Sequence, residues 1–105
     1  MRKKTMSVQS RVQHITDVLG ESMVLETITK LVHIEGQKCL KKIERLRQEL
    51  AEYERQFAMS SEDAWTKYQA GTLGDDFDTM EWMALCENLK ALQSQYDRIM
   101  ESELS

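Results

Sequence analysis

Four carboxylates that lie close together in the sequence could carry acid chemistry: Asp75, Asp76, Asp78 and Glu81, within "YQAGTLGDDFDTMEWMAL". A calcium loop needs acids at alternating positions, a central glycine and a terminal glutamate, whereas Gly74 precedes these acids. General acid–base catalysis needs two carboxylates in different environments across a pocket. These acids follow one another on a polar turn, with no His, Ser or Cys partner beside them. We therefore expect neither a metal site nor a catalytic site here.

The cysteines and histidines offer no alternative site. Cys39 and Cys86 each fall on or beside an apolar helical seam, without CxxC or His-adjacent spacing, so we predict buried free thiols. His14 and His33 fall on separate predicted helices and lack metal-ligand spacing. No P-loop, dinucleotide-binding or nucleophile motif is present. The sequence predicts a protein that is not an enzyme and binds no cofactor.

A helix start explains much of the acid cluster. Asp76 or Asp78 can accept hydrogen bonds from the first free backbone N–H groups, and Asp78-x-x-Glu81 has the spacing of a capping box. Acids at this position also interact favourably with the helix dipole. The first role that we assign to these residues is therefore structural.

The elements that position this cluster are all predicted to be helices. The chain has no Pro, 30 % of its residues are charged, and its long uninterrupted stretches favour good helix formers. Apolar spacing and turn residues predict a helix over 8–19, with Ser7 as its N-cap and Gly20 as its end. They predict a second helix over 22–58, with Ser22 as its cap. Further helices are expected over 61–70 and 77–103. The predicted fold is all-α and forms a single domain, residues 1–105.

Two apolar seams predict how the helices pack. The first seam, with Thr29 and Gly36 at weak positions, comprises Leu25, Val32, Cys39, Ile43, Leu46, Leu50, Tyr53 and Phe57. The second comprises Trp82, Leu85, Leu89, Leu92, Tyr96 and Ile99. We expect a long, coiled-coil-like helical hairpin with a short N-terminal helix and a short connecting helix. Helix 8–19 is expected to fold back over Val24, Ile28 and Leu31 as a third helix of the bundle.

The start of the last helix is apolar on a second face. Phe77, Met80 and Ala84 project about half a turn from the seam, with Met83 between. This face could pack on the short helix that carries Trp65 and Tyr68, on another subunit, or on a different protein. Aromatic residues and Met beside a rim of acids are typical of an interaction surface.

The charge is unevenly distributed. Residues 1–50 carry ten Lys/Arg and six acids, a balance of +4, whereas residues 51–105 carry four and twelve, a balance of −8. The acidic half disfavours nucleic acid along it and favours a basic partner. Arg2, Lys3, Lys4 and Arg11 could contact DNA, although no cluster of base-reading residues follows them. No apolar run is long enough to cross a bilayer and no signal peptide is evident, which predicts a cytoplasmic protein.

The segment "FAMSSEDAWTKYQAGTLGDDFDTMEWMALCENLKAL", residues 57–92, resembles a pattern in small helical proteins of bacteria and archaea. Its most specific positions are Gly71, Leu73, Gly74, Asp75, Asp76, Glu81 and Trp82, and Thr79 stands where the pattern has a large aromatic residue. The pattern is found in the antitoxin half of two-gene toxin–antitoxin pairs. The resemblance implies a small toxin, of the RNase type, as the partner.

The leading hypothesis is a helical antitoxin that covers a basic cognate toxin. The expected partner-binding residues are Trp65, Tyr68, Leu73, Asp75, Asp76, Phe77, Asp78, Met80, Glu81 and Met83. The basic N-terminal region would serve homo-oligomerisation or operator DNA. The alternative is a homo-oligomeric coiled-coil structural or adaptor protein, in which both seams serve only self-assembly.

Overall fold

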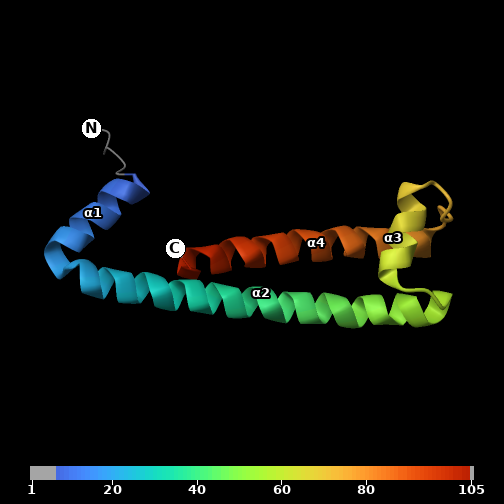
Figure 1. Cartoon of the computed structure of the whole chain (residues 1–105), viewed down its shortest axis with the longest axis horizontal. Helices are drawn as coiled ribbons and strands as arrows, with labels where there is room; N and C mark the ends of the chain where they lie inside the picture. The colour runs from blue at the N-terminus through green and yellow to red at the C-terminus, as the bar shows by residue number, and fades with distance from the viewer. Residues whose placement is uncertain (1–6, 105) are drawn as a thin grey trace, which may run out of the picture.

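The computed structural model describes residues 7–104, with side chains described as far as residue 101, and within this range it contains four helices joined by turns and no strand (Figure 1). The elements are α1 (Val8–Leu19), α2 (Glu21–Phe57), α3 (Ser61–Gln69) and α4 (Phe77–Leu104). The all-α prediction is confirmed, and each helix boundary lies within one residue of the predicted one. No helix in the described range combines the length and the apolar character needed to cross a membrane.

The helix ends follow from local capping. The Ser7 side chain accepts a hydrogen bond from the Ser10 N–H at 3.1 Å and so caps α1. Gly20 separates α1 from α2 with φ +92°, a backbone conformation that favours glycine. The prediction that Ser22 caps α2 is wrong, because α2 begins at Glu21 and has no side-chain cap. At its other end, α2 terminates at Ala58 in a left-handed conformation, with φ 51°.

The two long helices form the predicted antiparallel hairpin, with α4 lying along the C-terminal two-thirds of α2 (Figure 1). Gly36, Cys39, Ile43 and Leu50 are buried along the α2 side of the contact. A methyl group added at Gly36 would meet Met100, Tyr96 and Ile99 side-chain atoms at 3.6, 3.8 and 3.9 Å, which is ordinary van der Waals contact. Gly36 therefore marks a close passage of α4.

Both cysteines are free and buried, as predicted. The Cys39 thiol lies between the long helices and donates to the Leu92 carbonyl at 3.3 Å. Cys86 belongs to the main core cluster at the other end of the hairpin, together with Leu50, Ala64, Trp82 and Met83. The core of the molecule is thus concentrated where α2, α3 and α4 meet.

Helix α1 does not complete a three-helix bundle, and that prediction is wrong. Within the described residues α1 packs against α2 alone and diverges from it after the Gly20 turn (Figure 1). We call α1 together with residues 21–35 the N-terminal arm. Val24 and Val32 are half-buried, whereas its other ten large apolar side chains remain between 41 and 77 % exposed: Val8, Val12, Ile15, Val18, Leu19, Met23, Leu25, Ile28, Leu31 and Ile34. The chain is correspondingly elongated, with extents of 58 × 35 × 20 Å.

Replacing Gly36 by Ala is expected to raise the free energy of unfolding by about 0.5–1 kcal/mol, because the methyl group fits and the helix interior loses its most flexible residue. Denaturant unfolding at one fixed protein concentration measures the change. Gly36→Leu is the matched control, and it should cost about 1–3 kcal/mol through overpacking against α4. A loss of stability in Gly36→Ala would show that α4 passes closer than described.

Candidate functional site

The acidic segment is held in place by Trp82, which is completely buried. Its ring stacks on Phe57 at a centroid distance of 5.2 Å and on Tyr53 at 6.1 Å, with interplanar angles of 14° and 9°. Its indole N–H donates a hydrogen bond to the Ser61 hydroxyl at 3.0 Å. One side chain of α4 therefore contacts the end of α2 and the first residue of α3.

Glu54 completes the connection between α2 and α3. Its carboxylate accepts a hydrogen bond from the Ser61 backbone N–H at 2.7 Å. The adjacent Ser60 caps α3, since its hydroxyl accepts from the Asp63 N–H at 3.1 Å. The two serines thus have separate roles: Ser60 caps α3, and Ser61 accepts the hydrogen bond of the Trp82 indole.

Asp76 is the cap of α4. Its carboxylate accepts hydrogen bonds from the Thr79 hydroxyl at 2.6 Å and from the Thr79 N–H at 3.3 Å. The Thr79 side-chain bond, followed by backbone N–H donors, lowers the pKa of Asp76 below its ordinary value. The alternative cap at Asp78, with its capping box to Glu81, is wrong because α4 begins at Phe77. Thr79 itself is buried.

The structure divides the predicted partner-binding residues into three groups. Met83 is only 2 % exposed and packs in the core, so its assignment to an accessible surface is wrong. Trp65, Tyr68 and Leu73 are half-buried against the same core. The other six are exposed: Asp75, Asp76, Phe77, Asp78, Met80 and Glu81. The short helix α3 therefore uses part of the second apolar face of α4, and Phe77, at 79 % exposure, is left outside.

Two of the exposed acids line a groove between α2 and α4 of about 400 Å³. Asp78 and Glu81 come from α4, and the residues that face them from α2 are Glu49, Glu52, Tyr53 and Gln56. Partial burial, followed by the nearby Glu81 carboxylate, raises the pKa of Tyr53 above its ordinary value. Arg55 forms an ion pair with Glu52, which leaves the other three carboxylates of the groove without a salt bridge within residues 7–101.

Sequence reasoning missed the α2 side of this groove. Glu49 and Glu52 are separated from Asp78 and Glu81 by about thirty residues, so a scan for local clusters does not connect them. A signal was nevertheless available, because both flank Tyr53 of the seam, close to the turn of an antiparallel hairpin. Pairing the two seams at their turn ends would have placed these four acids together.

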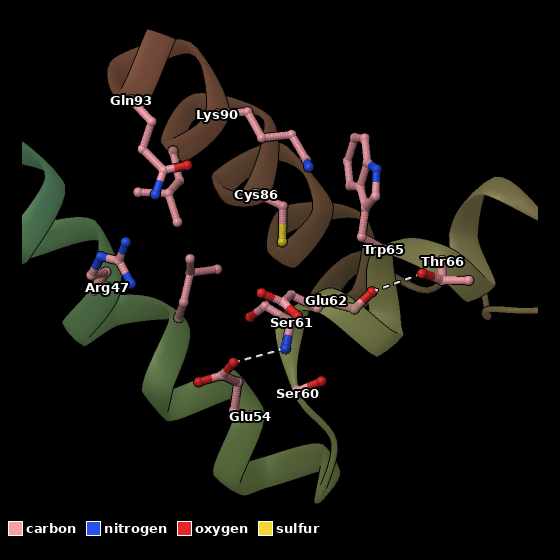
Figure 2. Close-up of a pocket in the computed structure, with 12 residues that line it drawn as sticks. Arg47, Glu54, Ser60, Ser61, Glu62, Trp65, Thr66, Cys86, Lys90 and Gln93 are labelled. Carbon is pink, nitrogen blue, oxygen red and sulfur yellow. Dashed lines mark hydrogen bonds between the residues drawn. The ribbon is translucent and has the colours of Figure 1, made fainter. Parts of the chain in front are cut away.

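A second pocket, of about 500 Å³, lies among α2, α3 and α4 (Figure 2). Arg47 and Lys90 line it together with Glu54, Glu62 and the Trp65 ring, and the Lys90 ammonium lies 5.1 Å from the centre of that ring. Figure 2 shows the Cys86 sulfur directed into the space. Burial raises the pKa of this thiol, against smaller opposing effects of Ser61 and Lys90, so the unreactive neutral form is favoured.

The two pockets share no lining residue. Trp65 belongs to the pocket with Lys90, whereas Asp78 and Glu81 belong to the acidic groove. Among the residues whose side chains are described, no three His, Cys, Asp or Glu side chains are grouped so as to hold a metal ion. His14 and His33 are both exposed, on α1 and α2.

No protein-family model, curated protein or solved structure matches the chain. Its function must therefore be inferred from its own residues and their arrangement.

Ser61→Ala is expected to lower the free energy of unfolding by about 1–3 kcal/mol, because the buried indole N–H of Trp82 loses its acceptor. Ser94→Ala, an exposed position on α4, is the matched control and should change stability by less than about 0.5 kcal/mol. Denaturant unfolding of both variants gives the comparison. Equal changes in stability in the two variants would mean that the Trp82–Ser61 hydrogen bond does not stabilise the protein.

The cap at Asp76 predicts a pH dependence of stability. A carboxylate whose pKa is lowered by folding stabilises the protein above its unfolded pKa, and this contribution is lost as the pH falls below the ordinary value of 3.8. Asp76→Asn should therefore lower the melting temperature at neutral pH, and the difference from the parent protein should disappear on acidification. Asp75→Asn, which leaves the cap in place, is the control. A difference that persists unchanged at low pH would contradict this role of the charge.

Proposed function

We propose that the chain is a cytoplasmic binding protein of the antitoxin type, which neutralises a basic toxin, an RNase, by direct protein–protein contact. The observation that carries this proposal is an exposed aromatic side chain beside an acidic groove. Phe77 is 79 % exposed at the start of α4, and the next residue, Asp78, lines the groove. Exposed large aromatic residues beside a cluster of like-charged side chains are typical of interaction surfaces.

We call Phe77, Met80 and the groove acids Glu49, Glu52, Asp78 and Glu81 the acidic surface. Its carboxylates would attract a Lys/Arg-rich partner and accelerate the encounter, and this effect is reduced by salt. Phe77 and Met80 would then bury apolar area against the partner, which slows dissociation. An RNase active site that binds phosphate with cations presents the complementary charge, so covering it would block its substrate.

The resemblance to antitoxins supports the proposal through the residues that shape this end of the molecule. Trp82 and Asp76, two of its specific positions, fix the start of α4 and so determine where Phe77 projects. Gly71 provides a positive φ of +74° in the turn after α3. These positions support the surface, and the contacts with a partner would come from the exposed residues between them.

A homo-oligomeric coiled-coil protein is the second candidate, and the exposed N-terminal arm favours self-association. A protein that serves only as a coiled-coil structural or adaptor protein would use both seams for self-assembly. From Gly36 to Phe57, however, the α2 seam already packs on α4 within the chain. Self-association through the arm is compatible with a separate binding site at the other end.

DNA binding by the N-terminal region receives less support. Arg2, Lys3 and Lys4 lie outside the described residues, and Arg11 lines an apolar groove of the arm.

The proposal predicts that Asp78→Lys combined with Glu81→Lys slows association with the toxin encoded by the neighbouring gene. The two changes reverse the charge of one wall of the groove, so association should slow by about 10-fold or more at low salt, and it should lose its salt dependence. Glu87→Lys with Asp97→Lys makes the same charge change at exposed positions of α4 outside the groove and serves as control. Stopped-flow or surface plasmon resonance measures the rates.

Phe77→Ala in the same assay should mainly accelerate dissociation, because the complex loses the apolar area that this side chain buries against the partner. The free protein should stay stable, because the side chain is exposed before binding. Asp76 is left unchanged, since it caps α4. The absence of a complex after co-expression, together with no rescue of growth, would contradict the proposal. Equal slowing by the control pair would indicate an effect of net charge rather than of this groove.

A further inference from the structure

The N-terminal arm carries apolar surface that nothing within the described residues covers. Ten of the arm's twelve large apolar side chains are each at least 41 % exposed, and a groove of about 300 Å³ between α1 and α2 is lined by Val12, Ile15, Leu19 and Met23 among others. Leu25 continues the hairpin seam of α2 beyond the reach of α4 and is 65 % exposed. A monomeric helical arm with such a face would leave it in contact with water, at a large cost in free energy.

The chain exposes more surface than a compact protein of the same mass. The chain has an accessible surface of 8596 Å², whereas a compact monomer of 12.3 kDa has roughly 6,100 Å². The radius of gyration is 20.6 Å, compared with about 13 Å for a compact domain of this length. The excess of roughly 2,500 Å² exceeds the roughly 800 Å² per chain that a standard stable interface buries.

The charge of the arm identifies the kind of partner. Residues 7–35 carry two basic and four acidic side chains, a balance of −2, compared with −8 for residues 51–105. A nearly neutral, apolar face gives no electrostatic preference for a strongly basic or strongly acidic protein. It can, however, meet an identical face without strong repulsion. The arm offers both a groove and a neighbouring apolar row with Leu25 and Leu31, so the row of each copy can pack into the groove of the other around a two-fold axis.

We infer that two copies of the chain associate through their N-terminal arms in an antiparallel, two-fold symmetric dimer, whose centre is a four-helix bundle of α1 and the first part of α2 from each copy. A parallel pair would place the two acidic ends side by side, whereas the antiparallel pair separates them. The dimer would be a rod of roughly 90 Å, since each α2 is about 55 Å long and the two overlap in their first 15 residues. This inference does not depend on the identity of the toxin, and it leaves both acidic surfaces free.

The test is the molecular mass of the full chain in solution, measured by light scattering after size exclusion at micromolar concentrations. The expected mass is about 25 kDa, twice the chain mass of 12.3 kDa. Leu25→Glu should convert the dimer to a monomer while far-ultraviolet circular dichroism confirms that the helical hairpin remains. Leu40→Glu makes the same change at another partly exposed position of α2, outside the arm, and should leave the dimer intact.

A monomer in the parent protein would overturn the inference, as would a dimer that Leu25→Glu leaves intact or a species larger than a dimer. If Leu25→Glu unfolds the chain, Val18→Glu at a second exposed position of the arm gives the same comparison. Spin labels at Gln56→Cys test the orientation, because the two labels should be too far apart for strong dipolar coupling in the antiparallel dimer. Strong coupling between them would establish a parallel pair and contradict the proposed arrangement.

Discussion

The burial of Trp82 between two helices and beneath a third is the interaction on which the rest of the structure depends. Its ring stacks on Tyr53 and Phe57 at the end of α2, and its N–H donates to Ser61 at the start of α3. The three helices therefore have one common reference point, although α2 and α4 are each long enough to slide along a regular seam. The hydrogen bond has one acceptor position, on α3, and Ser61 is itself held by the Glu54 carboxylate of α2, so the two bonds together favour one register of the hairpin, whereas apolar packing alone is less specific.

Much of the fold could be predicted because helical periodicity and end signals are local properties. The seams, the cap at Ser7 and the buried free thiols follow from spacing within a few residues. The errors occur where tertiary contacts decide the outcome. Met83 packs into the core, and α1 diverges from α2 instead of completing a three-helix bundle. Of the two caps predicted for α4, Asp76 is the one observed, and its hydrogen bonds to Thr79 are local. The acidic groove was half predicted, because Glu49 and Glu52 join it only through the pairing of distant helices.

The two ends of the molecule differ in the chemistry of their exposed surfaces. The end near Trp82 is acidic, well packed inside and exposes Phe77 and Met80, a combination suited to a basic protein partner. The N-terminal arm is nearly neutral and apolar, which suits an identical chain. A dimer through the arm and a toxin at each acidic end would place two bound partners at opposite ends of an extended rod, where they would not interfere with one another.

Hydrogen–deuterium exchange, with and without the toxin that we propose the neighbouring gene encodes, locates the contact without altering a residue. Addition of the toxin is expected to increase the protection of amides over residues 49–56 and 75–85, the two sides of the acidic surface, and to leave residues 8–35 unchanged. Protection confined to the N-terminal arm, with no change at the acidic surface, would contradict the proposed contact.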